Sequence, residues 1–363
     1  MGFFSRLVRR DGATVPSMDG VLRPNSSLDQ AAVLASVSEP DNLVAVDDDL
    51  IFSSVNALYR LTRAAGRMPE QIHMFDAAVT ALASSSDGAL AVGLSATGIR
   101  IVGGPHDGLL LDRIGPSPAR GPAALCFGDP DTLFVAIGSA DNEPQEWQRD
   151  LMERRSSGSV WKVDLKSRAA TCMGDGLAFP SGLLVHDGAL VVSESWSHRL
   201  LRFDINKAKA RPQIVVDDLP GYPGRLTPGG DGGAWLAVFA PRSQLIEFVL
   251  RERGYCGRML EELPKELWIA PSLRSGLSFR EPMQGGAVRV HGIFKPWAPT
   301  RSYGLAVRLG PDLQPVQSFH SRADGNRHGV VSLCEWQGVT AFASRGDNLI
   351  GALSLDDYAE GAQ

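Results

Sequence analysis

The sequence is poor in the residues that build disulfide frameworks and zinc sites. Only 4 of its 363 residues are cysteine and 7 are histidine. The cysteines stand singly and far apart, and no CxxC or His–Cys spacing is present, which argues against a zinc site or a redox pair. Three of them lie in apolar, strand-like runs, so we expect buried, reduced thiols. The four are Cys126, Cys172, Cys256 and Cys334.

The sequence also lacks a strong charge bias and long apolar runs. Its 36 Lys and Arg residues are scattered among 41 Asp and Glu residues, giving a net charge of −5, so no phosphate-binding face is expected and nucleic acid is not a predicted partner. No stretch reaches membrane-spanning length, and the opening MGFFSRLVRRDG has no apolar h-region. We therefore predict a cytoplasmic protein that does not contact a membrane.

The chain instead contains a repeated pattern. Six times, a polar turn precedes a short run of apolar and small residues typical of a β-strand. A repeat of about 40 residues with several short strands indicates a β-propeller, because a lone four-stranded sheet can bury its faces only against neighbouring sheets. We predict an all-β fold, a six-bladed β-propeller. The runs are DDDLIFSS (47–54), DGALAVGL (87–94), DPDTLFVAI (129–137), DGALVVSE (187–194), DGGAWLAV (231–238) and QGVTAFAS (337–344).

A second, amphipathic strand is predicted after most of these runs, including SQLIEFVL (243–250) in the fifth unit. Two insertions interrupt the repeat and are predicted to form helices on the propeller rim. The first, about 142–158, has a possible cap at Asn142; the second, about 247–300, has helical spacing of Leu and Met over 247–268. The predicted organisation is an N-terminal arm (1–28), one propeller domain (29–356) and a tail (357–363).

Several motifs resemble the strictosidine synthase-like family. The order and spacing of GLAFPSG (176–182), SESWSHRLLR (193–202), LPGYPGR (219–225) and DGGAWLAV (231–238) are similar to the family's pattern. The resemblance implies a six-bladed propeller and covers blades three to five closely. The wider superfamily includes gluconolactonases and paraoxonases, which are hydrolases with a calcium ion in the central channel. A shared fold does not by itself give a shared function.

The resemblance also implies where calcium ligands would lie. A hard cation needs oxygen ligands, and three of the four implied positions do not keep the family's Asn or Asp. We therefore predict no metal and no other cofactor. The implied positions are Asp41 or its neighbour Glu39, then Ala123 or Ala124, then Ser181, and finally Gly224 with Arg225.

Arg225 is the most informative of these positions. If the inner strand of blade five starts there, its guanidinium points into the channel and can pair with Asp41 where a cation would lie. It could then hold a carboxylate, a phosphate or a developing oxyanion. The alternative is that Arg225 bends out to solvent or makes a purely structural salt bridge.

His328 precedes the inner strand of the last blade, so we expect it at the channel mouth, where a histidine suits general acid–base work. A structural histidine is the alternative. The synthases' catalytic glutamate aligns with Val331 or a neighbour, and strand alternation directs Glu335 towards the turn. Glu194 and Arg199 match a Glu and an Arg of the family, but a structural pair explains them as well.

The predicted catalytic residues are thus Asp41, Glu39, Arg225 and His328. For substrate binding we predict an apolar pocket beneath the two insertions, suited to a flat ligand. Its candidate residues are Ser181, Tyr222, Trp147, Trp196 and Tyr303.

Three functions remain open for a small-molecule ligand. The first is a metal-independent hydrolase of esters or lactones, in which Arg225 stabilises the oxyanion and Asp41 or His328 activates water. The second is a metal-free synthase or lyase resembling strictosidine synthase. The third is a non-catalytic module that binds an anionic metabolite. No GxSxG elbow, Walker loop, HExxH or dinucleotide fingerprint occurs in a suitable context.

Overall fold

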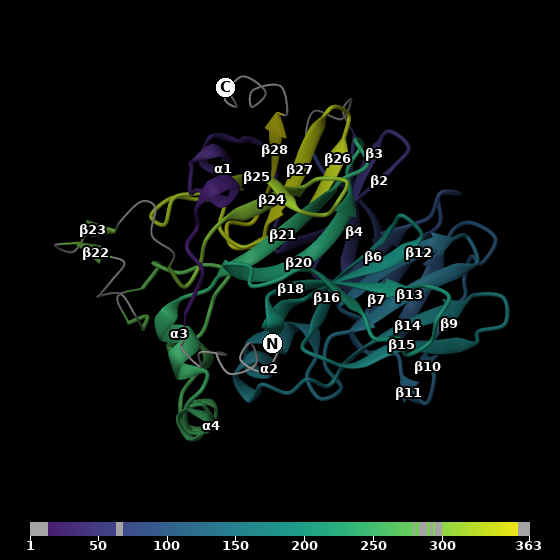
Figure 1. Ribbon diagram of the computed structural model, residues 1–363. Helices are drawn as coiled ribbons and strands as arrows, with labels where there is room; N and C mark the ends of the chain where they lie inside the picture. Colours follow the sequence, from purple (N-terminus) through teal and green to yellow (C-terminus); the bar gives the residue numbers. More distant parts are fainter. Residues whose placement is uncertain are drawn as a thin grey trace, which may run out of the picture.

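Six four-stranded antiparallel sheets form a ring, as a six-bladed β-propeller requires (Figure 1). The computed structural model describes residues 14–62, 68–278, 280–282, 289–290, 293–294 and 300–354, and all structural statements concern these residues. Blade one is β2–β5 (Pro40–Val46, Asp49–Ser54, Ala57–Leu61, Glu70–Met74), and blade two is β6–β9 (Val79–Ser84, Leu90–Leu94, Gly98–Val102, Leu110–Leu111). Blade three is β12–β15 (Ala124–Asp129, Thr132–Ile137, Gly158–Asp164, Ala170–Leu177), and blade four is β16–β19 (Pro180–His186, Ala189–Glu194, Arg199–Asp204, Gln213–Val216). Blade five is β20, β21, β24 and β25 (Gly221–Pro228, Ala234–Pro241, Leu305–Leu309, Pro315–His320), and blade six is β26–β28 with β1 (Val330–Trp336, Val339–Ser344, Leu349–Ser354, Ala32–Ser36).

The last blade is completed by the start of the propeller. β1 pairs with β28 in an antiparallel register, with Ala32 opposite Ala352 and Ser36 opposite Leu349. The N-terminal strand thus pairs with the C-terminal strand, which closes the ring and does not leave β28 as an unpaired edge strand. The predicted all-β, six-bladed fold is confirmed.

Each repeated run of the sequence is the second strand of its blade. All eight residues of β21 are buried, because both faces of this sheet pack against neighbouring blades. A strand buried on both faces reads as a continuous apolar run rather than as an alternating one. Near the hub the inner strands crowd together: a Cβ on Gly182 of β16 would lie 2.2 Å from the Gly224 carbonyl oxygen of β20, so only glycine fits.

The helices of the two insertions lie near one another at one side of the propeller (Figure 1). The first insertion forms η2 (Pro144–Glu146) and α2 (Trp147–Glu153), as predicted, and α2 packs against α4 (Arg253–Glu262). The strand predicted at 243–250 is wrong, because this segment forms α3 (Gln244–Val249); β24 takes its place as the third strand of blade five. Ile246 and Val249 are buried on α3, and their three-residue spacing suits a helix.

The remaining elements lie outside the blades. The second insertion also contains η4 (Lys265–Leu267) and the pair β22 (Arg289–Val290) and β23 (Ile293–Phe294); η3 (Ser195–Ser197) follows β17, and β10 (Arg113–Ile114) pairs with β11 (Ser117–Pro118).

The described part of the predicted N-terminal arm packs onto blade five. Its elements η1 (Gly20–Leu22) and α1 (Ser27–Gln30) both contact β25, and Leu28 is fully buried beside Trp235 and Phe319. The predicted tail (357–363) lies outside the described residues. In the part of the chain that the structure describes, no helix is long and apolar enough to cross a membrane.

Candidate active site

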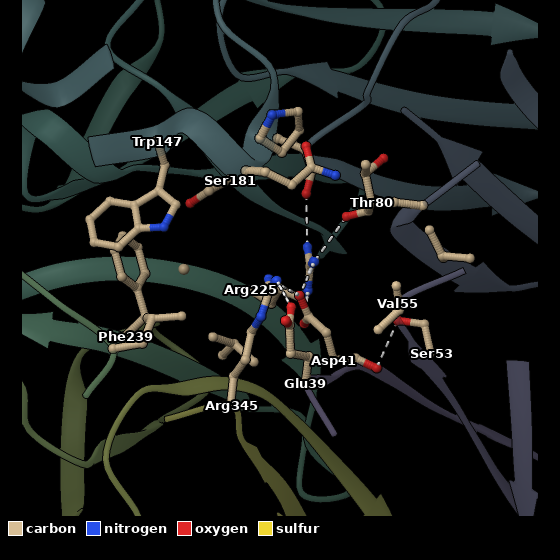
Figure 2. Close-up of a pocket in the computed structure, with 18 of the residues that line it drawn as sticks. Glu39, Asp41, Ser53, Val55, Thr80, Trp147, Ser181, Arg225, Phe239 and Arg345 are labelled. Atoms are coloured by element: carbon tan, nitrogen blue, oxygen red, sulfur yellow. Dashed lines mark hydrogen bonds and ion pairs between the residues drawn. The ribbon is translucent and has the colours of Figure 1, made fainter. Parts of the chain in front are cut away.

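A cavity of about 210 Å³ lies at the end of the channel next to η2 and α2, and Figure 2 shows residues that line it. Each blade contributes at least one residue that lies in its inner strand or directly before it, because the inner strands of all six blades converge on the channel. In blade order these residues are Asp41, Thr80, Ala123, Ser181, Arg225 and Val331. The positions at which the resemblance implied metal ligands therefore come together.

Arg225 crosses the channel and closes it below this cavity. Its Nε and Nη2 donate hydrogen bonds to the two carboxylate oxygens of Asp41, at 2.9 and 3.0 Å. Its Nη1 donates to the Ala123 carbonyl oxygen at 2.8 Å, and Nη2 also donates to the Thr80 carbonyl oxygen at 3.0 Å. One guanidinium thus connects blades one, two, three and five. The prediction that Arg225 points into the channel and pairs with Asp41 is correct.

Asp41 is held in its charged form. Burial alone would raise the pKa of its carboxyl, but the charge and hydrogen bonds of Arg225, together with Arg345 and the Asn42 N–H, outweigh burial and lower that pKa. Asn42 N donates to Asp41 Oδ1 at 2.7 Å. A carboxylate with its oxygens engaged in this way is a poor base, because a proton would have to displace the guanidinium.

This pairing predicts a pH dependence of stability. Because the folded pKa of Asp41 is lowered from 3.8, its contribution is fully present above about pH 4 and is lost as the pH falls through the folded pKa. We expect the free energy of unfolding in urea to fall more steeply from pH 6 to pH 3 in the wild type than in Asp41→Asn. Parallel slopes for the two proteins would contradict a lowered pKa.

A second ion pair lies above the first. Arg345, which follows β27, donates from Nη2 to Oε2 of Glu39, and its Nη1 lies 4.0 Å from Oδ2 of Asp41. The Glu39 side chain is 51% exposed, compared with 14% for Asp41. Glu39 and Arg345 are therefore the carboxylate and the cation that a ligand can reach most easily.

The opposite wall of the cavity is aromatic. Trp147 of α2 meets Phe239 of β21 edge to face at 5.3 Å between ring centroids, and Phe179 completes the wall. Trp196 stacks behind Phe179 at 4.6 Å, and its Nε1 donates to Asp150 Oδ1 at 2.8 Å. Rigid aromatic rings of this kind bind flat apolar groups with little loss of side-chain entropy.

Ser181 belongs to the cavity lining, but its hydroxyl already makes hydrogen bonds within the protein. Its Oγ lies 2.6 Å from Ser195 Oγ and donates to the Pro223 carbonyl oxygen at 3.0 Å. Of the predicted binding residues, Ser181 and Trp147 line the cavity, and Trp196 supports the aromatic wall from behind. Their roles in substrate binding remain predictions.

The expectation that His328 reaches the channel mouth is wrong. The side chain is 1% exposed; Nδ1 accepts from the Ser302 hydroxyl at 2.8 Å, and Nε2 donates to the Arg322 carbonyl oxygen at 2.9 Å. Burial lowers the pKa of its imidazole, so the ring stays neutral near pH 7. Its hydrogen bonds to Ser302 and Arg322 hold the ring against the segments that flank β24 and β25 rather than in the channel.

Tyr222 and Tyr303 also lie outside the cavity lining in the described structure. Tyr222 is fully buried beneath the helices and donates its hydroxyl to Glu247 at 3.0 Å. Tyr303 is 1% exposed and lies 3.3 Å from His320 Nδ1 through its hydroxyl. The sequence predicts both in the pocket because they lie near the rim, and this prediction is wrong: Tyr222 packs with residues of α3 and α4, and Tyr303 packs in the core beside β24.

The lining includes residues that sequence reasoning missed. Arg345 in SRGDN directly follows β27, the second strand of its blade; the second strand of blade five is likewise followed by an arginine, Arg242, so this position alone gave no signal. Phe179 and Phe239 lie within motifs that had been noted, but their direction depends on backbone details. Phe179, for example, has a φ of 58°, which turns its ring towards the channel.

Glu335 and Glu194 both make their hydrogen bonds outside the channel-mouth cavity. Glu335 of β26 accepts hydrogen bonds from Trp235 Nε1 and Gly230 N, near the turn and away from the channel-mouth cavity, as expected. Glu194 accepts from Ala178 N at 2.7 Å and pairs with Arg199, so this pair connects strands, in agreement with the structural alternative.

The residues at the hub do not fit a calcium ion. Calcium takes six to eight oxygen ligands. Here the implied carboxylate, Asp41, and two carbonyl oxygens that face the hub all accept hydrogen bonds from Arg225. A cation in that space would have to displace the guanidinium and would be repelled by it. In the described residues, no group of three or more His, Cys, Asp or Glu side chains is arranged to hold a metal.

Similarity to known proteins agrees with this architecture. The chain is 25% identical over 193 residues to strictosidine synthase-like protein 2 of Arabidopsis thaliana, covering 51% of this chain and 45% of that protein. The chain is thus similar in sequence to the strictosidine synthase-like proteins, which its motifs resemble. It is also 28% identical over 233 residues to the adipocyte plasma membrane-associated protein of Danio rerio, covering 63% and 47%. The matched part of the chain thus spans about half the length of these curated relatives. No family model matches.

Solved structures share the six-bladed propeller fold at low sequence identity. A gluconolactonase from Xanthomonas campestris superposes with a TM-score of 0.57 and 13% identity, covering 96% of this chain and 99% of that one. Regucalcin, a calcium-binding protein from Agrobacterium tumefaciens, gives 0.52 and 11%, covering 89% and 92%. At these identities the similarity establishes the fold alone.

Proposed function

We propose that the channel-mouth cavity is the active site of a metal-independent enzyme that hydrolyses an ester or lactone of a small organic molecule. The observation that carries the proposal is the pairing of an aromatic wall with an accessible carboxylate and guanidinium, Glu39 and Arg345. The sequence similarity to a strictosidine synthase-like protein supports an enzyme of this general type.

The geometry changes the roles first predicted from the sequence. Arg225 uses four of its five N–H groups on Asp41 and two carbonyl oxygens, so it is a hub residue rather than an oxyanion donor. His328 is buried elsewhere. The reacting groups are then Glu39 as general base and Arg345 as the cation that stabilises negative charge.

In this mechanism the Glu39 carboxylate accepts a proton from a water molecule as the water oxygen attacks the substrate carbonyl carbon. The carbonyl oxygen becomes an oxyanion beside the Arg345 guanidinium. Collapse of the tetrahedral intermediate breaks the bond to the alcohol oxygen, which receives the proton from Glu39. The flat apolar part of the substrate rests against Trp147 and Phe239 throughout.

The test is turnover of aryl esters and of five- and six-membered lactones, compared with Arg345→Gln. We expect hydrolysis above the uncatalysed rate and a loss of about tenfold or more in kcat/KM in the variant, because one charged donor to an oxyanion is removed. Arg100→Gln on β8, at an exposed position outside the cavity, is the control. Absence of turnover for every ester and lactone would contradict the proposal.

A second candidate is a binding module for an anionic metabolite, favoured by the engagement of Arg225 and Asp41 with each other rather than with the cavity. Binding of small organic anions without turnover of any ester or lactone would support this candidate and overturn the first.

Calcium removal gives an independent prediction. We expect EGTA and added calcium to leave both the thermal unfolding midpoint and the hydrolysis rate unchanged, since Arg225 occupies the space of a channel cation. Elemental analysis should find no stoichiometric calcium. An increase of several degrees in the unfolding midpoint with calcium would show that the ion binds the folded state and would contradict this prediction.

A further inference from the structure

A second cavity adjoins the one at the channel mouth. This side cavity has a volume of about 420 Å³ and lies between the rim insertions and blades one and six. The two cavities share five lining residues, so a ligand at the channel mouth can extend into the side cavity. The shared residues are Glu39, Gln145, Trp147, Leu273 and Arg345.

The two cavities together are positively charged, although the whole chain carries −5. Their ionisable lining residues are two carboxylates, Glu39 and Asp41, and four cations. Arg225 neutralises Asp41, and Arg345 neutralises Glu39. The remaining two cations, Lys265 and Arg274, both line the side cavity.

These two cations differ in how many hydrogen-bond and ion-pair partners the protein gives them. Arg274 lies 3.5 Å from Asp347 Oδ1 and donates from Nη1 to the Gly325 carbonyl oxygen at 3.0 Å. Within the described residues, Lys265 Nζ has a single hydrogen-bond partner, the Gln145 carbonyl oxygen at 3.3 Å. Lys265 is therefore the cation with donor capacity left for a ligand, since an ammonium carries three donors.

The surroundings of Lys265 disfavour its charged form and lower the pKa of its amine. Burial is the largest cause that lowers the pKa of its amine, and the positive charge of Arg345 lowers it further, while Glu146 and Glu266 raise it. An anion bound between Lys265 and Arg345 would offset both unfavourable effects.

Resting on the proposed function, we infer that the substrate carries an anionic group, a carboxylate or a phosphate, which binds in the side cavity between Lys265 and Arg345. The apolar part of the same molecule lies on Trp147, which lines both cavities. The substrate class is thus a small amphipathic organic anion rather than a neutral sugar lactone or a neutral ester.

Equilibrium binding tests this inference without requiring turnover. The probes are 1-naphthylacetate with its neutral amide, and 1-naphthyl phosphate with 1-naphthol, titrated into the full chain by calorimetry. We expect at least one anion to bind about tenfold more tightly than its neutral counterpart; the pair with the larger ratio identifies carboxylate or phosphate. The preference should shrink at high salt, because screening weakens ionic contacts near the surface.

Variants at one position locate the site. Lys265→Gln should remove most of the anion preference, whereas Lys265→Arg should retain it. Lys166→Gln, which removes an exposed lysine paired with Asp131 on blade three, should not change it. Equal affinity for anion and neutral probe, no binding of either, or a preference unchanged in Lys265→Gln overturns the inference. If anion binding is present but no ester or lactone is hydrolysed, the proposed function fails while this inference stands.

Discussion

Arg225→Met should lose about 3–5 kcal/mol of folding free energy, the largest stability effect expected for a single substitution in the channel. Removing one partner of a buried ion pair leaves the other charge without compensation. Here Asp41 and two carbonyl oxygens, Ala123 O and Thr80 O, would lose their donors together. Equilibrium unfolding in urea measures the loss, and the thermal midpoint should fall by roughly 10 °C for a chain of this size.

Two controls distinguish this effect from a general loss of charge. Arg60→Met removes an arginine that pairs with Glu70 on an exposed surface of blade one, and little change is expected because solvent already screens that pair. Asp41→Asn combined with Arg225→Met should recover part of the loss, because the unpaired carboxylate is gone. A loss in Arg225→Met no larger than that in Arg60→Met would show that the hub does not depend on this guanidinium.

Glu39→Gln should lower kcat for ester or lactone hydrolysis by about 10²-fold or more, with little change in ligand affinity. A glutamine occupies the same volume but cannot accept the proton of the attacking water, and general base catalysis typically contributes 10²- to 10⁴-fold. Steady-state kinetics with the best substrate of the ester and lactone panel, together with calorimetric binding of a non-hydrolysed probe, separates the two effects.

The matched control is Glu70→Gln, another exposed glutamate that pairs with an arginine, Arg60, away from the cavity. It should keep the wild-type rate. Asp41→Asn provides a second comparison: its effect should fall mainly on stability, because both Asp41 oxygens are bound by Arg225. If Glu39→Gln retains full kcat while Asp41→Asn abolishes it, the base is Asp41 and the assignment made here is wrong.

The organisation of the blades could be predicted because it depends on short-range patterns. Each repeated run is buried on both sheet faces, as β21 illustrates, so its apolar residues are continuous and easily recognised. The same rule failed at 243–250, where the apolar residues Leu245, Ile246, Phe248 and Val249 suit a strand and a helix equally. Tertiary packing against α2 and α4 made it a helix.

The candidate site was predicted only in part, for a related physical reason. Arg225 and Asp41 lie 184 positions apart, yet both could be placed in the channel because each was expected at the start of an inner strand. The structure places Asp41 second in β2 but Arg225 in the middle of β20, which begins earlier than expected, at Gly221. His328 also precedes an inner strand, but hydrogen bonds to Ser302 and Arg322 turn its ring away. Strand order alone does not give the direction of a side chain in the turn before a strand.

By itself, the sequence determined the number of blades and the presence of an arginine, Arg225, in the inner strand of blade five. These follow from repeat spacing and residue type, which are local properties of the chain. Only the tertiary structure decided which charges a ligand can reach. Arg225 and Asp41 satisfy each other, whereas Glu39, Arg345 and Lys265 face the two cavities. Accessibility depends on contacts between distant segments, and no local pattern records those contacts.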